Sequence, residues 1–343
     1  MKRKKNILIL NTGGTISSIK TSKGYEPAQG YVAQMLRTLP FFSNPDMPNY
    51  TILEYEPLLD SSNVTLTEWN RIASDIMVYY DQVDGFVILH GTDTMAYTAS
   101  ALSFMLEHLG KPVILTGSQI PLSQVRNDAL DNVITSLLIA TNPLLHEVCI
   151  YFNQKLLRGN RARKVSSSRF DAFDSPNFPH LATLGVQINL NNRLLLPAPE
   201  QSCCYQPMVS QCIGNFRLYP GGASDMLARL LQQPIKALVL ETYGSGNAQN
   251  NDPDFLDSLR DAVLRDIVIV NCSQCPHGGV EMGSYATGYT LKKAGLLSGH
   301  DMTPETVHSK LLYLFSKYSD LGEIKYHMEL NLVGELTETQ GDH

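Results

Sequence analysis

Ile7-Leu8-Ile9-Leu10-Asn11-Thr12-Gly13-Gly14-Thr15 and Gly85-Phe86-Val87-Ile88-Leu89-His90-Gly91-Thr92-Asp93 are the two stretches that decide the fold. Each is a continuous run of apolar residues followed at once by a turn that contains glycine and threonine. Such a run is typical of a strand that is buried on both faces, as the inner strands of a parallel sheet are. Ligands bind at the carboxyl ends of the strands in open parallel sheets. We therefore expect the two turns to face one another across one site.

The first half of the chain alternates between segments that favour strands and segments that favour helices. Thr65-Leu66-Thr67-Glu68 has the residues of a capping box and precedes a helical pattern of apolar side chains from Trp69 to Tyr80. Gly110-Lys111-Pro112 ends the next helical pattern. The expected strands lie at 7–10, 51–55, 85–89, 113–116 and 147–152, and the expected helices at 65–80, 96–109 and 128–141. This β-α-β order predicts a mostly parallel sheet flanked by helices.

Residues 153–183 interrupt that alternation. They hold several basic side chains among Gly, Asn, Ser and Pro, namely Arg158, Arg161, Arg163, Lys164 and Arg169. This composition favours a loop that runs over a site and holds an anion, rather than a core element. A plain solvated connection is the competing interpretation.

The remainder of the chain repeats the α/β pattern on a smaller scale. Leu196-Pro197-Ala198-Pro199-Glu200-Gln201 is typical of an interdomain linker. After it, strands are expected at 237–240 and 267–270, and helices at 223–231, 255–264 and last from Pro304, with Thr303 as its N-cap. We predict an α/β fold with a larger N-terminal domain (1–193) that carries the catalytic residues, a linker (194–214) and a smaller C-terminal α/β domain (215–343).

Composition limits the class of protein. With 343 residues, 43% of them hydrophobic, the chain can bury a large core and exceeds the usual size of one domain. The net charge of -6 gives no basic field of the kind that nucleic-acid binding requires. No stretch approaches the roughly eighteen consecutive apolar residues that span a membrane. The apolar run after the basic start ends at Asn11, too soon for a secretory signal. Neither nucleic acid nor a membrane is therefore an expected partner.

The six cysteines are too sparse for a disulfide scaffold. Without an export signal they are expected to be reduced thiols, which agrees with a cytoplasmic protein. Cys272-Ser-Gln-Cys275 has no second Cys-x-x-Cys pair to complete a four-ligand zinc site. It also ends an apolar run, where buried cysteine is common, so no metal is expected there.

The two turns differ from the common nucleotide-binding loops. Neither is a G-x-G-x-x-G motif and neither ends in Gly-Lys-Ser/Thr, which disfavours nucleotide binding. A threonine hydroxyl is a poor nucleophile until a neighbouring group takes its proton. A desolvated lysine can act as that base, and an adjacent carboxylate can orient it. Thr92, Lys164 and Asp93 supply these groups, and such chemistry needs no cofactor.

The same turns carry a family resemblance. Residues 9–17 and 85–95 resemble, along their whole length and in the same order, the two signatures of the bacterial-type L-asparaginases. The resemblance continues through 116–119, 159–164 and 244–247 and is strongest to the cytoplasmic type I branch.

The resemblance implies a role for each residue that matches the family motifs. Thr15, the second threonine of Thr-Gly-Gly-Thr, corresponds to the nucleophile, and Tyr25 to the phenol that assists it. Thr92, Asp93 and Lys164 correspond to a second catalytic triad. The residues implied to bind the substrate are Asp60, Ser61, Ser62, Thr92, Asp93 and Asn247. Ser61 would hold the α-carboxylate and Asp93 the α-ammonium, while Asn247 reaches a neighbouring subunit's site in relatives.

The implied reaction is hydrolysis of L-asparagine to L-aspartate and ammonia through an acyl-enzyme, in a homo-oligomer that is a dimer or a tetramer. Three alternatives remain open: a glutaminase-leaning enzyme, an amidotransferase-like amidohydrolase that depends on tRNA, and a catalytically silent amino-acid sensor. Some relatives carry a second, regulatory asparagine pocket lined by a threonine and an arginine. This chain has Arg163 and Glu241 at those positions, which argues against regulation by asparagine.

Overall fold

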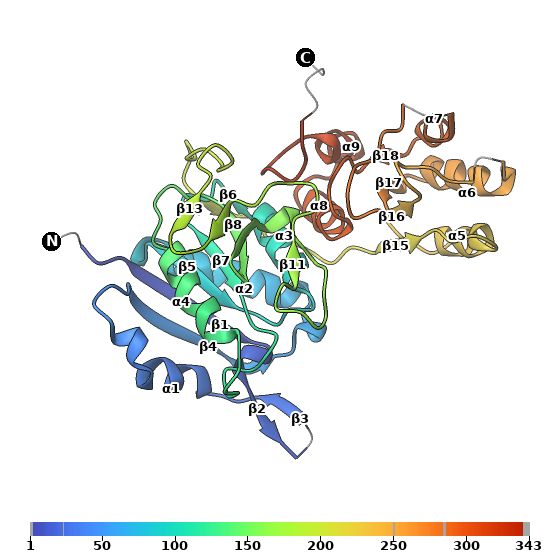
Figure 1. The fold of residues 1–343 in the computed structure, drawn as a ribbon. Coiled ribbons are helices and arrows are strands. Elements are labelled where there is room, and N and C mark those ends of the chain that lie inside the picture. Colours follow the sequence, from blue (N-terminus) through green and yellow to red (C-terminus); the bar gives the residue numbers. More distant parts are fainter. Residues whose placement is uncertain (1–2, 23, 250, 284–285, 339–343) are drawn as a thin grey trace. The chain divides into compact units, whose positions relative to one another are not determined.

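The computed structural model describes residues 3–22, 24–249, 251–283 and 286–338 (Figure 1). The chain forms two compact units. One comprises Met1–Ser175 and Pro179–Tyr205, and the other comprises Pro176–Phe178 and Gln206–His343. No helix in the described ranges is both long enough and apolar enough to cross a membrane.

The first unit is built on an eight-stranded sheet, with the strand order β13-β12-β9-β8-β7-β5-β1-β4. Strands β4, β1, β5, β7 and β8 run parallel, and β9, β12 and β13 continue the sheet in antiparallel pairs. The strands are β1 (Asn6–Gly13), β4 (Asn49–Leu59), β5 (Gly85–Leu89), β7 (Val113–Thr116), β8 (Val148–Phe152), β9 (Lys155–Arg158), β12 (Ala182–Leu184) and β13 (Ile188–Leu190). The predicted mostly parallel sheet is confirmed.

Strands β1 and β5 lie side by side within this sheet, in register from Ile7 opposite Gly85 to Asn11 opposite Leu89. Every residue of β5 is buried, as are Ile7 to Leu10. This burial on both faces is what their continuous apolar character favours, because alternate side chains of a strand point to opposite faces. Both strands therefore deliver their carboxyl ends to one edge of the sheet.

Four helices belong to the described part of the first unit: α1 (Tyr31–Thr38), α2 (Leu66–Tyr79), α3 (Met95–Met105) and α4 (Ala129–Ile139). Helix α2 begins with the predicted capping box, in which the Thr65 side chain accepts from the helix backbone and Glu68 binds the Thr65 N–H. Helix α3 begins directly after the second turn and is buried along almost its whole length. It thereby fixes the turn at the end of β5 against the core.

The prediction that 153–183 is a loop without core elements is wrong in part. Its residues Lys155–Arg158 form β9, which pairs with β8 through a tight turn in which Asn153 and Gln154 have φ of 45° and 66°. Hairpin turns of this kind usually carry glycine, and this one does not. The Arg158 side chain is buried and paired with Glu147 at 2.6 Å, so this cation is not part of an anion site.

The segment 194–205 is bound to the first unit. The carbonyl of Leu194 accepts from Arg158 at 2.6 Å, and the N–H of Leu196 donates to Glu147 at 3.0 Å. Strand β14 (Cys204–Tyr205) pairs with β6 (Leu106–Glu107), where the chain becomes extended after α3.

The second unit has a four-stranded parallel sheet in the order β15-β16-β17-β18. Its strands are β15 (Ile213–Arg217), β16 (Ala237–Thr242), β17 (Val268–Ser273) and β18 (Leu297–Ser298), and its helices are α5 (Ala223–Leu231), α6 (Pro253–Leu264), α7 (Ala286–Lys293), α8 (Pro304–Lys317) and α9 (Leu321–Glu329). The predicted smaller C-terminal α/β domain is confirmed. Thr303 caps α8 as expected, but α8 is not the last helix, because Asp320 caps a further short helix.

Candidate active site

The site is built where β1 and β5 end. Gly14 follows β1 with φ of 83°, and a Cβ placed on it would lie 2.4 Å from the Gly91 nitrogen, so only glycine permits this approach of the two backbones. The Thr12 hydroxyl donates to the Leu89 carbonyl at 2.8 Å and ties the two strand ends together. Thr15 and Thr92 each follow one of these two glycines directly in the chain. Thr15 opens the 3-10 turn η1 (Thr15–Ser17) and is partly exposed.

The end of β4 supplies a third side of the site. The Gly14 N–H donates to the Leu59 carbonyl at 2.9 Å, and Asp60 caps the 3-10 turn η3 (Ser61–Asn63). A Cβ on Gly91 would lie 2.4 Å from the Ser61 hydroxyl oxygen. Ser61 is buried, whereas Asp60 and Ser62 are exposed. The predicted Asp60-Ser61-Ser62 segment therefore lies beside both hydroxyl-rich turns.

Lys164 reaches the second turn from β10 (Arg163–Lys164), which pairs with β11 (Phe173–Asp174). Its Nζ lies 2.7 Å from the Thr92 Oγ1 and 2.7 Å from the Asp93 Oδ1. Thr92 is buried, and the Asp93 side chain is 63% exposed. The Lys164 amine therefore contacts both the Thr92 hydroxyl and the Asp93 carboxylate, although Lys164 is remote from these two residues in sequence.

The segment after β7 contributes Gln119 to the site. The Thr92 hydroxyl donates to the Gln119 Oε1 at 3.5 Å, the Gln119 Nε2 donates to the Arg169 carbonyl at 2.9 Å, and the Gln119 N–H donates to Asp128 at 2.9 Å. Gln119 therefore lines the site next to Thr92. Thr94 was not predicted as a site residue, although it follows Thr92 and Asp93 in His-Gly-Thr-Asp-Thr. Its hydroxyl donates to the Ser61 carbonyl at 2.7 Å.

His90 is part of the core beneath the site. Its Nδ1 lies 2.7 Å from the Gly91 carbonyl, which can only accept, so this nitrogen carries the proton. Its Nε2 lies 3.0 Å from the Thr98 hydroxyl, which accepts from the Trp69 indole at 2.9 Å and can therefore donate to the ring. Burial lowers the pKa of His90. A neutral imidazole with both nitrogens satisfied fits a structural histidine.

Tyr25 lies on the hairpin of β2 (Ser18–Thr21) and β3 (Gly24–Pro27). Strand β3 lies against the turn η1 that begins with Thr15, and the Tyr25 side chain is 49% exposed. Asn247 belongs to the second unit, where its backbone N–H donates to the Tyr243 carbonyl at 2.7 Å. Its part in the site stays a prediction.

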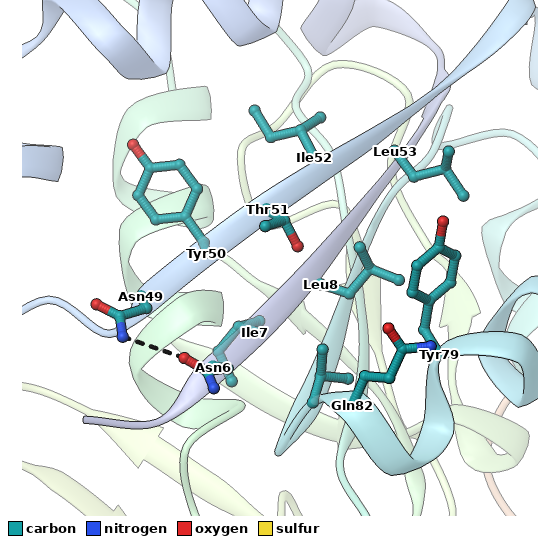
Figure 2. A pocket seen from close by; sticks show the side chains of 11 residues that line it. Asn6, Ile7, Leu8, Asn49, Tyr50, Thr51, Ile52, Leu53, Tyr79 and Gln82 are labelled. Carbon is teal, nitrogen blue, oxygen red and sulfur yellow. Dashed lines mark hydrogen bonds between the residues drawn. The ribbon is translucent and has the colours of Figure 1, made fainter. Parts of the chain in front are cut away.

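A separate hollow of about 380 Å³ is not part of this site (Figure 2). Figure 2 shows Asn6, Leu8, Asn49 and Thr51 of the amino-terminal halves of β1 and β4 beside Tyr79. The hydroxyl-rich turns lie beyond the opposite ends of these strands.

Fold and geometry together define an open α/β protein with a hydroxyl, amine and carboxylate site at the carboxyl ends of its parallel strands. Residues 6–196 match the family described as "Asparaginase, N-terminal", and residues 213–328 match "Glutaminase/Asparaginase C-terminal domain". The chain belongs to the asparaginase family.

Individual relatives match over almost the whole chain. This chain is 49% identical to L-asparaginase 1 of Escherichia coli strain K12, over 98% of this chain and 99% of that protein. The crystal structure of L-asparaginase I from Vibrio cholerae matches with a TM-score of 0.91 and 45% identity, covering 98% of this chain and all of that one. A glutamyl-tRNA(Gln) amidotransferase subunit of Methanobrevibacter smithii is 33% identical over 98% of this chain and 78% of that protein.

Proposed function

We propose that this protein hydrolyses L-asparagine to L-aspartate and ammonia, with Thr15 as the nucleophile of an acyl-enzyme. The observation that carries the proposal is the contact of Lys164 with both Thr92 and Asp93, at 2.7 Å each, beside the turn that holds Thr15. The similarity to asparaginases over the whole chain favours asparagine as the amide.

The first chemical step is attack by the Thr15 hydroxyl oxygen on the side-chain carboxamide carbon. The hydroxyl proton passes to an unprotonated Lys164 through Thr92, and Asp93 orients the lysine. Backbone N–H groups of the turns stabilise the tetrahedral oxyanion, an effect worth about 3 to 4 kcal/mol per donor. The amide nitrogen leaves as ammonia after it gains a proton, with Tyr25 assisting. Water then hydrolyses the β-aspartyl ester and restores the Thr15 hydroxyl.

The charged groups of the substrate suit the residues around the turns. The Asp93 side chain is 63% exposed and can bind the α-ammonium of the amino acid while it contacts Lys164. The Asp60-Ser61-Ser62 segment provides hydroxyl and backbone donors for the α-carboxylate. Asn247 would complete the binding residues from a neighbouring subunit in a homodimer or homotetramer. The six free cysteines agree with a cytoplasmic location.

Ammonia release from L-asparagine, compared with L-glutamine, tests the proposal. Asparagine is expected to have the higher kcat/KM. One methylene in a pocket is worth about 1 to 3 kcal/mol, so a preference for glutamine would identify a glutaminase on the same scaffold. Binding of an amino acid without any ammonia release would instead support a sensor. Activity that requires a charged tRNA would support an amidotransferase.

A further inference from the structure

Glu54 is the centre of a hydrogen-bond network at the base of the Tyr25 hairpin. It lies on β4, and its Oε2 accepts from the Asn11 Nδ2 at 2.7 Å. Asn11 is fully buried on β1, and its Oδ1 accepts from the Ser17 hydroxyl at 2.9 Å. Ser17 is the last residue of η1, the turn that Thr15 begins. One carboxylate oxygen of Glu54 is thereby tied to the nucleophile's turn.

The other carboxylate oxygen holds the chain where it leaves the hairpin. The Glu54 Oε1 accepts from the Gln29 Nε2 at 2.8 Å and from the Gly30 N–H at 2.5 Å. The Gln29 amide also donates to the Tyr55 carbonyl at 3.1 Å. Gly30 is the N-cap of α1, so the same contact fixes the start of that helix. Glu54 is therefore linked to both ends of the segment that contains β2 and β3, through Asn11 at the first end and directly at the second.

This arrangement sets where the hairpin stands relative to Thr15. Between the two anchored ends the residues of β3 are exposed, so few buried contacts hold the hairpin. The backbone bond from the Ala28 N–H to the Ser17 carbonyl, at 2.9 Å, closes the base that Glu54 braces. A shift at this base would be carried to Tyr25.

We propose that Glu54, acting through Asn11 and Gln29, is a positioning residue of the reaction: it holds the base of the hairpin so that Tyr25 stands beside the Thr15 turn. The proposal rests on the proposed function for its kinetic part. Glu54 itself does not contact the reacting atoms, and its part is to fix geometry. Small displacements of reacting groups are sufficient to slow an enzyme strongly.

The polarity of the network provides a sharp test. In Glu54→Gln the new amide has two ways to sit, and each breaks a contact. If its NH2 group faces Asn11, the Asn11 amide must turn over and the buried Ser17 hydroxyl loses its acceptor; if it faces Gln29 and Gly30, donors repel donors. In Asn11→Asp two carboxylates face each other. The double variant that combines N11D with E54Q restores every bond, with the direction of the central one reversed. The new amide on β4 then donates to the new carboxylate on β1, which still accepts from Ser17, and the net charge is unchanged.

The experiment measures kcat and KM for asparagine, and trypsin cleavage after the exposed Lys20, in the full-length protein. Each single variant is expected to lower kcat about tenfold with a smaller change in KM, and to speed cleavage after Lys20 severalfold. The double variant is expected to recover both to within about threefold of the original protein. Gln29→Ala removes only the contacts on the hairpin side of the network, and it should also lower kcat and speed cleavage after Lys20. This variant replaces a Glu54 or Asn11 variant that does not fold.

Asp84→Asn is the matched control. Asp84 is also a carboxylate that accepts a backbone N–H, from Asn6 at 2.8 Å, but it lies at the amino end of β1 and β5. It should lower stability without changing kcat or cleavage after Lys20. The proposal is overturned if the Glu54 variant matches the original protein in both readouts, if kcat falls while cleavage is unchanged, or if the double variant stays as impaired as the single ones. An original protein that releases no ammonia would instead reject the proposed function, and the cleavage rates would still test the anchoring of the hairpin.

Discussion

The Nζ of Lys164 lies 2.7 Å from the Oγ1 of Thr92, although the two residues are 72 positions apart in the chain. The contact depends on the short β10–β11 ladder, which places Lys164 over the carboxyl end of β5. The Lys164 side chain is only 20% exposed, so its amine is held at the site by Thr92 and Asp93 and does not extend into solvent.

Lys164→Met should therefore lower kcat by about 10²- to 10⁴-fold, the usual contribution of a general base. Lys155→Met is the matched control, because Lys155 comes from the same basic segment, is also 20% exposed and pairs with Asp171 at 2.8 Å. Its kcat should stay close to that of the original protein. Steady-state ammonia release measures both, and equal kcat values for the two variants would remove Lys164 from the catalytic role.

Thr15→Ala should lower kcat on the order of a thousandfold or more, because it removes the attacking oxygen. Thr12→Val provides the comparison within the same turn. Its lost hydroxyl bond to the Leu89 carbonyl should cost about 1 to 3 kcal/mol of stability and leave most of the activity. Calorimetric binding of aspartate would show whether the Thr15 variant keeps its pocket. Near-normal turnover of that variant would exclude Thr15 as the nucleophile.

Gly14→Ala should damage both stability and activity. The new Cβ would meet the Gly91 backbone at 2.4 Å, and the residue would have to keep a φ of 83°. Gly221→Ala has nearly the same φ, 79°, with no atom within 4 Å of its Cβ, so it should show only the conformational cost of about 1 to 2 kcal/mol. Urea unfolding should therefore place Gly14→Ala clearly below Gly221→Ala. Equal unfolding midpoints would mean that the backbone contact is not tight.

Much of the fold can be predicted from local pattern. Strands at 85–89 and 113–116 coincide with β5 and β7, because each apolar run is bounded by residues that end it. Strand β9 could not be predicted, since its hairpin turn lacks glycine and its buried Arg158 is compensated by Glu147, 11 positions away. Tertiary pairing of this kind leaves no periodic signal.

The site is less predictable than the fold. The two turns follow strands, so their meeting follows from the topology of a parallel sheet. Lys164 comes from a segment of many basic residues, and only the family resemblance distinguished it. Glu54 lies within a predicted strand, and its partners Asn11, Gln29 and Gly30 are scattered along the chain. A hydrogen-bond network that joins such positions cannot be predicted from one sequence.

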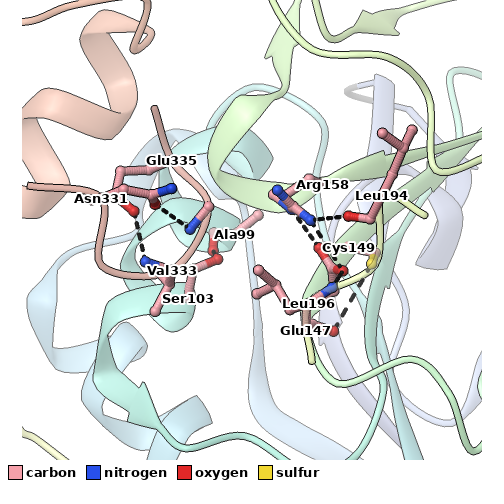
Figure 3. Close-up of polar contacts among 11 residues, drawn as sticks. Ala99, Ser103, Glu147, Cys149, Arg158, Leu194, Leu196, Asn331, Val333 and Glu335 are labelled. Carbon is pink, nitrogen blue, oxygen red and sulfur yellow. Dashed lines mark hydrogen bonds and ion pairs between the residues drawn. The ribbon is translucent and has the colours of Figure 1, made fainter. Parts of the chain in front are cut away.

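Glu147→Ala should be among the more destabilising substitutions in the first unit. Figure 3 shows hydrogen bonds from the Arg158 guanidinium to the Glu147 carboxylate and to the Leu194 carbonyl. Both side chains of this ion pair are about 95% buried or more, so removal of the carboxylate leaves a buried charge at a cost of about 3 to 5 kcal/mol. Asp257→Ala, which breaks an exposed pair with Arg260, should cost less than about 1 kcal/mol. Urea unfolding measures the loss of stability in both variants. Equal losses would contradict the conclusion that Glu147 compensates a buried charge on Arg158.

His90 makes the stability of the first unit depend on pH. Burial lowers its pKa in the folded state, whereas in the unfolded chain it titrates near its ordinary value of about 6.5. Below that pH the unfolded state binds a proton that the folded state does not, so stability is full above about pH 6.5 and falls as the pH decreases, by up to about 1.4 kcal/mol per pH unit.

His90→Gln lacks this titration, while the remaining histidines, including the partly buried His308, whose pKa desolvation also lowers, are common to both proteins. The variant is expected to be the less stable one at pH 7.5, since it disrupts bonds to Gly91 and Thr98. The difference in stability between this variant and the original protein should shrink as the pH falls to 5.5, because only the original protein then loses the stability that His90 contributes. Urea midpoints at the two pH values measure this, and parallel pH profiles would show that His90 is protonated in the folded protein.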